Sequence, residues 1–325
     1  MGRPALLATP LLEPVAVTVR RILSGTDDGA SAVNRAIARP SGAPGWFGPS
    51  SAAWQVHGSV ATFLGGIRAL LLQAVHPRAL AGVEGHSSYR EDPFGRLQRT
   101  GAFIAATTFG SVDLAERTVA AVGRVHERVR GTTADGRRYA ATDEDLLTWV
   151  HIALVDSMLE AYLRFGTNGQ LVADHYVADM AVVGAAMGVP DPPTDTRGLA
   201  EAFTRFAPDL AGGPQARRVR EFVLAPPLPS ATRAGYAVLA RAAEDTLPGW
   251  AQDLLGSPAR SAPVRWADHL AARALLTTLQ LAPVESPARR AARERLGIDL
   301  AVMQALAASR QRDTSGTYAL SVTPV

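Results

Sequence analysis

Residues 111–131 read Ser-Val-Asp-Leu-Ala-Glu-Arg-Thr-Val-Ala-Ala-Val-Gly-Arg-Val-His-Glu-Arg-Val-Arg-Gly and predict the best-delimited helix of the chain. Ser111 is suited to cap its first turn, and the helix is expected to run to Arg130, just ahead of a glycine. One face of this helix is apolar at the three- and four-residue spacing of an α-helix. That face carries one imidazole, His126, among Val119, Val122 and Val129.

The same spacing of apolar residues recurs along most of the chain and predicts an all-α protein. Helices are expected at 59–75, 77–85, 93–109, 142–165, 169–187, 197–211, 229–246, 262–281 and 286–309. A short strand pair near 137–140 is the only extended structure that the pattern predicts. We expect a single multi-helix domain at 45–310, best defined over 45–166, with an N-terminal helical segment at 1–44 and a C-terminal tail at 311–325.

The composition excludes several classes of chemistry. The 325 residues include no cysteine, which removes disulfides, thiolate nucleophiles, iron–sulfur clusters and thiolate-ligated haem. They also include no lysine, which removes Schiff-base chemistry and the lysine of a phosphate-binding loop. Acidic and basic residues are interspersed and the formal net charge is only +3, so nucleic acid is not an expected partner.

The N-terminal region shows no pattern typical of export. Residues 1–15 lack the basic flank and the continuous apolar stretch of a secretion signal. The most apolar segment, 60–75, carries Arg68 near its middle and is too short to span a bilayer. We therefore expect a cytoplasmic protein without an integral membrane segment.

Two residues of the 111–130 helix need an explanation. His126 lies in an apolar stripe, where it is either a hydrogen-bonded core residue or a metal ligand. Gly123 lies one turn before it, although glycine inside a helix costs about 1 kcal/mol relative to alanine. Close approach of a flat macrocycle would require that glycine, and so would tight packing of another helix. Arg130, four residues beyond His126, could reach an anionic group beside the imidazole.

The predicted helix at 93–109 carries a polar pair on one face. Arg96 and Thr100 are four residues apart, so they are neighbours on the helix surface. They could orient an anionic group or hold a bound oxygen species, or Arg96 could pair with a surface carboxylate.

The apolar run 146–159 contains Trp149, His151 and Asp156. A buried carboxylate needs a partner, such as an arginine or a helix N-terminus, to offset its loss of hydration. We therefore expect a buried polar network around Asp156, either structural or functional.

An ordered series of motifs resembles the MpaB and latex-clearing-protein family of oxygenases. The motifs are Gly45–Ser50 (GWFGPS), Trp54–His57 (WQVH), Leu70–Pro77 (LLLQAVHP), His86–Ser87, Asp92–Thr100 (DPFGRLQRT), Val125–Gly131 (VHERVRG) and Trp149–Ser157 (WVHIALVDS), with a fainter echo at 247–256. Each motif is short, but their order across 45–166 is specific.

The resemblance implies an all-α fold with a globin-like core that binds haem b through a histidine. In rubber-cleaving members the ligand lies in a His-x-x-x-Arg motif that follows an Arg-x-x-x-Thr motif. His126 is then the implied iron ligand, with Arg130 behind it. The other residues implied at the cofactor or the bound oxygen are Arg96, Thr100, Gly123 and Arg124.

The sequence departs from the rubber-cleaving members at three points. Gly123 stands where those enzymes have an arginine three residues before the ligand. Arg99 stands where they have a lysine that can approach the iron, and arginine is a poor ligand because it stays protonated. The export signal is also missing. These departures favour a small organic molecule inside the cell over polyisoprene.

The implied function is a haem-b-dependent oxygenase or peroxygenase that uses dioxygen or peroxide, for example in natural-product tailoring. His86, His76 and Glu84 could assist on the open side of the iron, although His76 also suits a helix cap before Pro77. A non-catalytic helical protein that binds haem or lipid is one alternative, and a haem-free metal enzyme is another.

Overall fold

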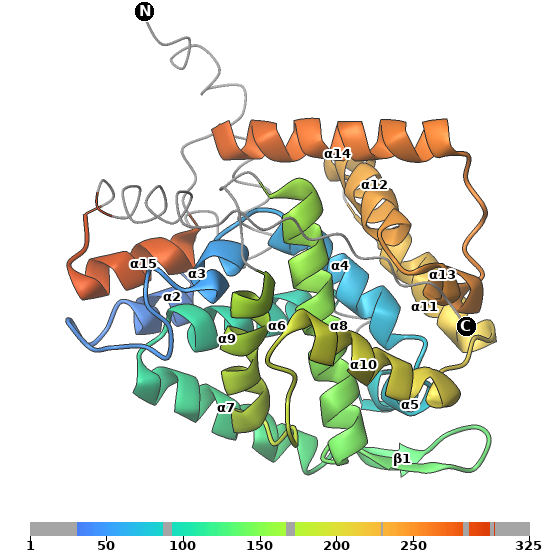
Figure 1. Ribbon diagram of the computed structural model, residues 1–325, viewed down its shortest axis with the longest axis horizontal. Helices are drawn as coiled ribbons and strands as arrows, with labels where there is room; N and C mark the ends of the chain where they lie inside the picture. Colours follow the sequence, from blue (N-terminus) through green and yellow to red (C-terminus); the bar gives the residue numbers. More distant parts are fainter. Residues whose placement is uncertain are drawn as a thin grey trace, which may run out of the picture.

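The protein is an assembly of helices with one small β-hairpin (Figure 1). The computed structural model describes residues 31–86, 93–166, 173–228, 230–281, 286–299 and 302. Its α-helices are α2 (Ala32–Ile37), α3 (Ala52–His57), α4 (Thr62–Gln73), α5 (Pro77–His86), α6 (Pro93–Phe109), α7 (Val112–His126), α8 (Glu144–Phe165), α9 (Ala173–Ala186), α10 (Thr196–Phe206), α11 (Pro214–Leu224), α12 (Ser230–Asp245), α13 (Gly249–Leu255), α14 (Ala262–Leu281) and α15 (Pro287–Leu296). The predicted all-α class is confirmed, whereas a globin-like core stays a prediction.

The hairpin consists of β1 (Arg130–Thr132) and β2 (Arg138–Ala140), which pair antiparallel. The strand pair predicted near 137–140 is therefore present, with its first strand at 130–132. Gly131 lies opposite Tyr139, and the Tyr139 ring folds across it: a Cβ at Gly131 would lie 2.6 Å from the Tyr139 hydroxyl. That hydroxyl donates to the carbonyl oxygen of Ala81 at 3.3 Å, which fixes the hairpin to α5.

The core is organised around α4 and α8, which pack against each other in the middle of the molecule (Figure 1). α8 is buried on most of its faces, as expected for a helix enclosed by other helices. Gly65 on α4 allows their close approach, because a Cβ there would lie 2.6 Å from Sδ of Met158. The helices α3, α9, α10 and α14 contact α8, and α11 and α12 contact α4.

An ion pair between buried Arg68 and half-buried Asp156 joins the two central helices. Arg68 Nη1 lies 2.6 Å from Oδ2 of Asp156 and donates to Oγ of Ser157 at 2.8 Å. Its Nε donates to the carbonyl oxygen of Thr246 at 3.4 Å. The polar network predicted around Asp156 is therefore present, and its contacts tie α4 to α8 and to the end of α12.

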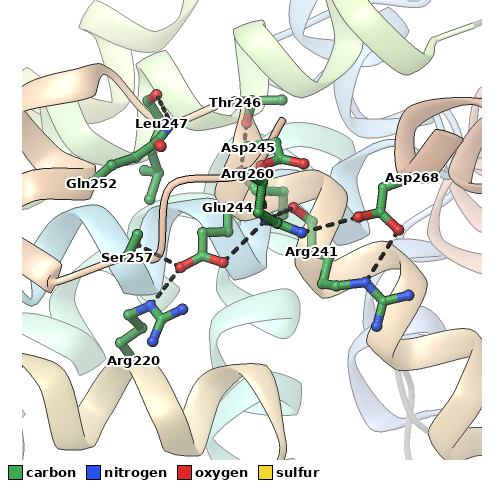
Figure 2. A network of polar contacts seen from close by, with 11 residues as sticks. Arg220, Arg241, Glu244, Asp245, Thr246, Leu247, Gln252, Ser257, Arg260 and Asp268 are labelled. Atoms are coloured by element: carbon green, nitrogen blue, oxygen red, sulfur yellow. Dashed lines mark hydrogen bonds and ion pairs between the residues drawn. The ribbon is translucent and has the colours of Figure 1, made fainter. Parts of the chain in front are cut away.

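A second polar network joins α11, α12 and α14 (Figure 2). Its members are Arg220, Arg241, Glu244, Asp245, Ser257, Arg260 and Asp268. Buried Glu244 lies at its centre, 2.5 Å from Arg220 Nε and 3.2 Å from Arg260 Nη2. Three arginines balance three carboxylates, so the network holds these helices together without leaving a net charge.

Several predicted helices have the boundaries that local signals indicate. The helix predicted at 93–109 is α6, and the one predicted at 262–281 is α14. Ser111 caps α7 as expected, since its Oγ accepts the backbone N–H of Leu114 at 3.3 Å. The helices predicted to begin at 59, 77 and 197 are present with small shifts of their ends. Those predicted at 169–187 and 229–246 are α9 and α12, and their predicted first residues lie outside the described residues.

The predicted end of the helix at 111–130 is wrong. α7 ends at His126, and Arg130 belongs to β1, where it lies opposite Ala140. The N–H of Ala141 also donates to the carbonyl oxygen of Val129 at 2.8 Å. Pairing with residues 138–141 therefore overrides the helical pattern after His126, so Arg130 follows the imidazole from a strand and not from the next helical turn.

Another predicted boundary shifts slightly and one is wrong. α8 begins at Glu144, two residues later than predicted, and the carboxylate of Asp143 just before it accepts the N–H of Ala140 at 2.9 Å, which links the hairpin to the helix start. α15 ends at Leu296, far short of 309, because Gly297 adopts a left-handed φ of 64°. The short helices α3, α11 and α13 were not predicted.

Candidate functional site

The apolar face of α7 is only partly covered by the protein. Ala115 is the one buried residue of this helix. The four residues of the predicted stripe are all half-buried: Val119, Val122, His126 and Val129. α7 packs against α6, which follows a path beside it (Figure 1). An apolar helix face normally packs into a core, so this one has surface available for a further group.

His126 lies at the last position of α7, and its carbonyl oxygen accepts the N–H of Val129 at 3.0 Å. Within the described part of the chain its ring makes no hydrogen bond, ion pair or ring contact. Burial lowers the pKa of the imidazole below its ordinary value, so the ring is neutral at pH 7. A neutral ring nitrogen is the form that binds a metal, whereas the alternative of a hydrogen-bonded core histidine has no partner here.

Gly123 faces open space one turn before the imidazole. A Cβ built at this position would meet no atom within 4 Å in the described part of the chain. Tight packing of another described helix, one of the two explanations for this glycine, is therefore excluded. The open position beside His126 fits the other explanation, the approach of a flat group to the helix backbone.

Replacement of Gly123 by alanine is expected to stabilise the protein without cofactor by about 0.5–1 kcal/mol, because alanine costs less helix entropy and meets no neighbour. Urea unfolding measures this change. Gly184→Ala is the matched control: it should destabilise the protein, since a Cβ there would lie 2.7 Å from the ring of His151. A loss of stability in Gly123→Ala would show that the position is in fact packed.

His86 is brought beside the segment that follows His126. It is the last residue of α5 and is exposed, and its Nε2 lies 3.1 Å from the carbonyl oxygen of Arg130. A carbonyl oxygen only accepts, so Nε2 carries the proton and Nδ1 of the neutral ring is the acceptor. The structure thus joins two predicted site residues that are 44 positions apart in the sequence.

The two predicted arginines on this segment differ in their placement. Arg130 is exposed and folds back on the end of α7, where its Nη2 donates to the carbonyl oxygen of Glu127 at 2.7 Å. Arg124 is exposed and lies two residues before His126, which is roughly 200° around a helix. The Arg130 guanidinium therefore lies at the carboxyl end of α7, beside the Glu127 carbonyl, and Arg124 lies on the opposite side of α7 from His126.

α6 carries the second predicted pair, Arg96 and Thr100, in its first turns. Only Gly110 and Ser111 separate α6 from α7, and the two helices pack together, so the start of α6 and the end of α7 lie at the same end of the pair. Thr100 and Arg99 are exposed. The side chain of Arg96 lies outside the described part of the structure.

Two other residues proposed for the open side of the iron have contacts elsewhere. His76 is 1% exposed; its Nδ1 accepts the N–H of Ala79 at 3.4 Å, as expected for a cap of α5, and its ring packs on Trp149. The carboxylate of Glu84 accepts from Gln215 at 2.8 Å, towards α11. Of the three residues considered for this role, His86 alone contacts the His126–Arg130 segment.

Sequence reasoning missed a buried histidine that supports α6. His57 Nδ1 lies 2.7 Å from Thr108 Oγ1, and Nε2 lies 2.9 Å from the hydroxyl of Tyr176. The imidazole therefore bridges α3, α6 and α9. His57 occurs in one of the family-like motifs, but both partners are more than fifty residues away, so local spacing could not identify them.

Other features of the described chain do not form a competing site. No group of three or more His, Asp or Glu side chains in it could hold a metal ion. Two surface depressions of about 270 Å³ each lie elsewhere, one between α5 and the start of α11 and one beside Thr148 and Phe206.

Of the described helices, α8 alone is long and apolar enough to cross a membrane, and 67% of its apolar window is buried within the protein.

Comparison with known proteins agrees with the order of the motifs. The family model described as "ER-bound oxygenase mpaB/B'/Rubber oxygenase, catalytic domain" matches residues 54–281, from α3 to the end of α14. No curated protein and no solved structure matches the chain. The family match spans well over half of the sequence and includes the segment with His86, Arg96, Thr100 and His126. The chain therefore belongs to the MpaB and rubber-oxygenase family of oxygenase catalytic domains.

Proposed function

We propose that this protein is a cytoplasmic haem-b-dependent oxygenase or peroxygenase that oxidises a small organic molecule, as in natural-product tailoring. The observation that carries the proposal is the surroundings of His126: a neutral imidazole without a hydrogen-bond partner, on an apolar helix face that the described protein leaves partly uncovered.

The residues around His126 suit haem in three respects. A histidine that holds haem iron binds it through a neutral ring nitrogen, and His126 would offer such a nitrogen. The flat haem ring needs an apolar surface that it can approach closely. The half-buried valines of α7 and the open position at Gly123 provide such a surface. The haem propionates need cations, and Arg130 and Arg96 belong to the segments next to the imidazole. When bound, haem supplies iron-centred oxidation of the substrate with dioxygen or peroxide.

The chain's own residues have distinct roles in this proposal. His126 binds the iron, and Val119 and Val122 exclude water from its surroundings. Arg96 and Thr100 would position the dioxygen or peroxide that reacts. His86 holds a proton on Nε2 and can accept one at Nδ1, because Arg130 fixes this tautomer. Gly123 and Arg99, which replace an arginine and a lysine of the rubber-cleaving members, favour a substrate other than polyisoprene.

The visible spectrum of the purified full chain, as isolated and after addition of hemin, tests this proposal. We expect a Soret band with the wild-type protein, and at least tenfold weaker hemin binding with a shifted band in His126→Ala, because the axial ligand is lost. His175→Ala removes an exposed histidine of α9 and serves as control. A protein that stays colourless with hemin, or a His126→Ala variant with an unchanged band, would contradict the proposal.

A further inference from the structure

The segment around and after His126 carries the unbalanced charge of the protein. Residues 124–138 include five arginines, all exposed, and two carboxylates, so these fifteen residues have a net charge of +3. The whole chain has 33 basic and 30 acidic residues, so the rest of the sequence is formally neutral. The end of α7 and the adjoining β1–β2 hairpin, at the lower edge of Figure 1, form this basic surface. Its arginines are Arg124, Arg128, Arg130, Arg137 and Arg138.

Three arginines of the basic surface have no anionic partner in the described part of the chain. Arg137 pairs with Asp135 at 2.9 Å. The guanidinium groups of Arg124, Arg128 and Arg138 make neither an ion pair nor a hydrogen bond with the described residues. These three cations are therefore available to a group from outside the protein.

The hairpin carries two arginines on its outer face. Side chains alternate along a strand, so Gly131 and Tyr139 face α5 and their neighbours face outwards. Arg130 and Arg138 lie on the outer face, diagonally opposite each other across the two strands. Side chains in this relation are roughly 7–8 Å apart, so their like charges repel. Folding does not require this repulsion, and a partner of opposite charge would relieve it.

The arginines at the end of α7 point away from the imidazole. Arg124 lies two residues before His126 and Arg128 two residues after it, and Glu127 keeps helical dihedral angles. Two residues correspond to roughly 200° around a helix, so neither arginine can hold a molecule bound at the imidazole. Val125 is 56% exposed beside them and adds an apolar contact. The basic surface therefore suits a separate macromolecule and not the substrate.

A small acidic protein fits this surface better than nucleic acid. Clustered charges of one sign attract and orient a partner of the opposite sign. Single-stranded nucleic acid would need aromatic side chains on which bases stack, and residues 124–138 include none. The formally neutral remainder of the chain offers no basic track along which a longer phosphate backbone could continue.

The position next to His126 indicates what this partner supplies. Insertion of one atom of dioxygen into a substrate breaks a C–H bond and forms a C–O–H group. The second oxygen atom is reduced to water, which takes up two electrons and two protons. The chain has no cysteine, so it cannot hold a thiolate-ligated iron–sulfur cluster as its own electron source. A donor bound at Arg128 would lie two residues along the chain from the proposed iron ligand.

We propose that the basic surface docks a small acidic iron–sulfur protein, which delivers electrons to the cofactor at His126. This inference rests on the proposed function and extends it, because the reaction then uses dioxygen with external electrons and not peroxide. Transient complexes of electron-transfer proteins bury less than about 1,200 Å² in total. One helix end and one hairpin are enough for an interface of that size.

Binding of a plant-type [2Fe–2S] ferredoxin, chosen for its acidic surface, tests the docking. Calorimetric titration of the full chain at low ionic strength should detect a complex that about 0.5 M salt weakens at least tenfold. Arg128→Ser/Arg138→Ser should also bind at least tenfold more weakly, because two unpaired cations are lost. Arg218→Ser/Arg290→Ser removes the same charge from exposed positions of α11 and α15 and should bind like the wild type. All variants should unfold at the wild-type urea concentration.

Reduction of the hemin-loaded protein gives a second readout. Reduced ferredoxin should convert the Soret band to that of the ferrous form. The rate should be at least tenfold lower in Arg128→Ser/Arg138→Ser, because fewer encounters lead to a complex. Dithionite is a small reductant that needs no docking surface, so it should reduce the variant and the wild type equally fast.

Four results would overturn the inference. The ferredoxin could fail to bind a chain that does bind hemin, or it could bind the double variant as tightly as the wild type. The complex could persist in about 0.5 M salt, which would exclude a charge-dependent contact. Duplex DNA or anionic vesicles could bind in place of the ferredoxin, which would assign the surface to another class of partner. Binding of the ferredoxin to a chain that takes up no hemin would instead place the failure in the proposed function.

Discussion

Between pH 7 and pH 5 the protein is expected to lose about 6 kcal/mol of folding free energy, because three buried histidines must stay neutral in the folded state. Burial lowers the pKa of His57, His76 and His151 to about 4 each. In the unfolded chain each has a pKa of about 6.5. Between these values the unfolded chain binds protons that the folded protein does not. The stability is therefore fully present above pH 6.5 and is lost as the pH falls towards 4, at about 1.4 kcal/mol per histidine and pH unit.

Burial away from water explains why these rings resist protonation. His57 bridges Thr108 and Tyr176, and the Nδ1 of His76 accepts a backbone N–H, so a proton on that nitrogen would place two donors face to face. Urea unfolding at a series of pH values measures the loss. His151→Gln should flatten the slope by about a third, whereas His175→Gln removes an exposed ring and should leave it unchanged. Equal stability at pH 7 and pH 5 would contradict the expectation.

Local signals predicted the elements that depend on local contacts. α6 begins at Pro93 and ends just before Gly110, and Ser111 caps the start of α7. These boundaries therefore follow from residues that are neighbours in the sequence. The end of α7 depends on pairing between 130–132 and 138–140. The helical periodicity up to Arg130 contains no sign of this strand pairing. The helix predicted from the sequence is therefore four residues longer than α7 at its carboxyl end.

The sequence predicts which residues belong to the candidate site, but it does not predict how they are arranged. Periodicity located His126 and Gly123 on one side of a helix, but it could not decide between a packed neighbour and open space. The structure decides this for Gly123, which no described atom approaches. The contact of His86 with Arg130 joins α5 to the hairpin across 44 residues, a separation over which sequence spacing carries no information.

Asp156 shows the same limit in the core. Its place in an apolar run required a partner on energetic grounds alone. That partner is Arg68, 88 residues earlier in the sequence. The sequence therefore predicts that Asp156 has a partner. Which residue is the partner depends on how α4 packs against α8.

Arg68→Met is expected to destabilise the protein by about 3–5 kcal/mol, because it leaves the Asp156 carboxylate without its cation between α4 and α8. Methionine fills much of the arginine volume, so the cost arises chiefly from the unpaired charge and the lost bond to Thr246. The midpoint and slope of urea unfolding measure it. Arg197→Met is the matched control: Arg197 pairs with Glu201 at 2.9 Å on the surface, and its loss should change stability by no more than about 0.5 kcal/mol.

The double variant Arg68→Met/Asp156→Leu separates the charge from the packing. If the unpaired carboxylate causes the loss, removing it as well should restore most of the stability, since apolar replacement of a buried ion pair is often close to neutral. The double variant should then unfold at a higher urea concentration than Arg68→Met alone. If instead the two losses add, Arg68 stabilises the protein mainly through its contacts with Ser157 and Thr246, and the pair with Asp156 contributes little. The size of this coupling decides whether the loss in Arg68→Met arises from the unpaired carboxylate or from the lost hydrogen bonds of Arg68.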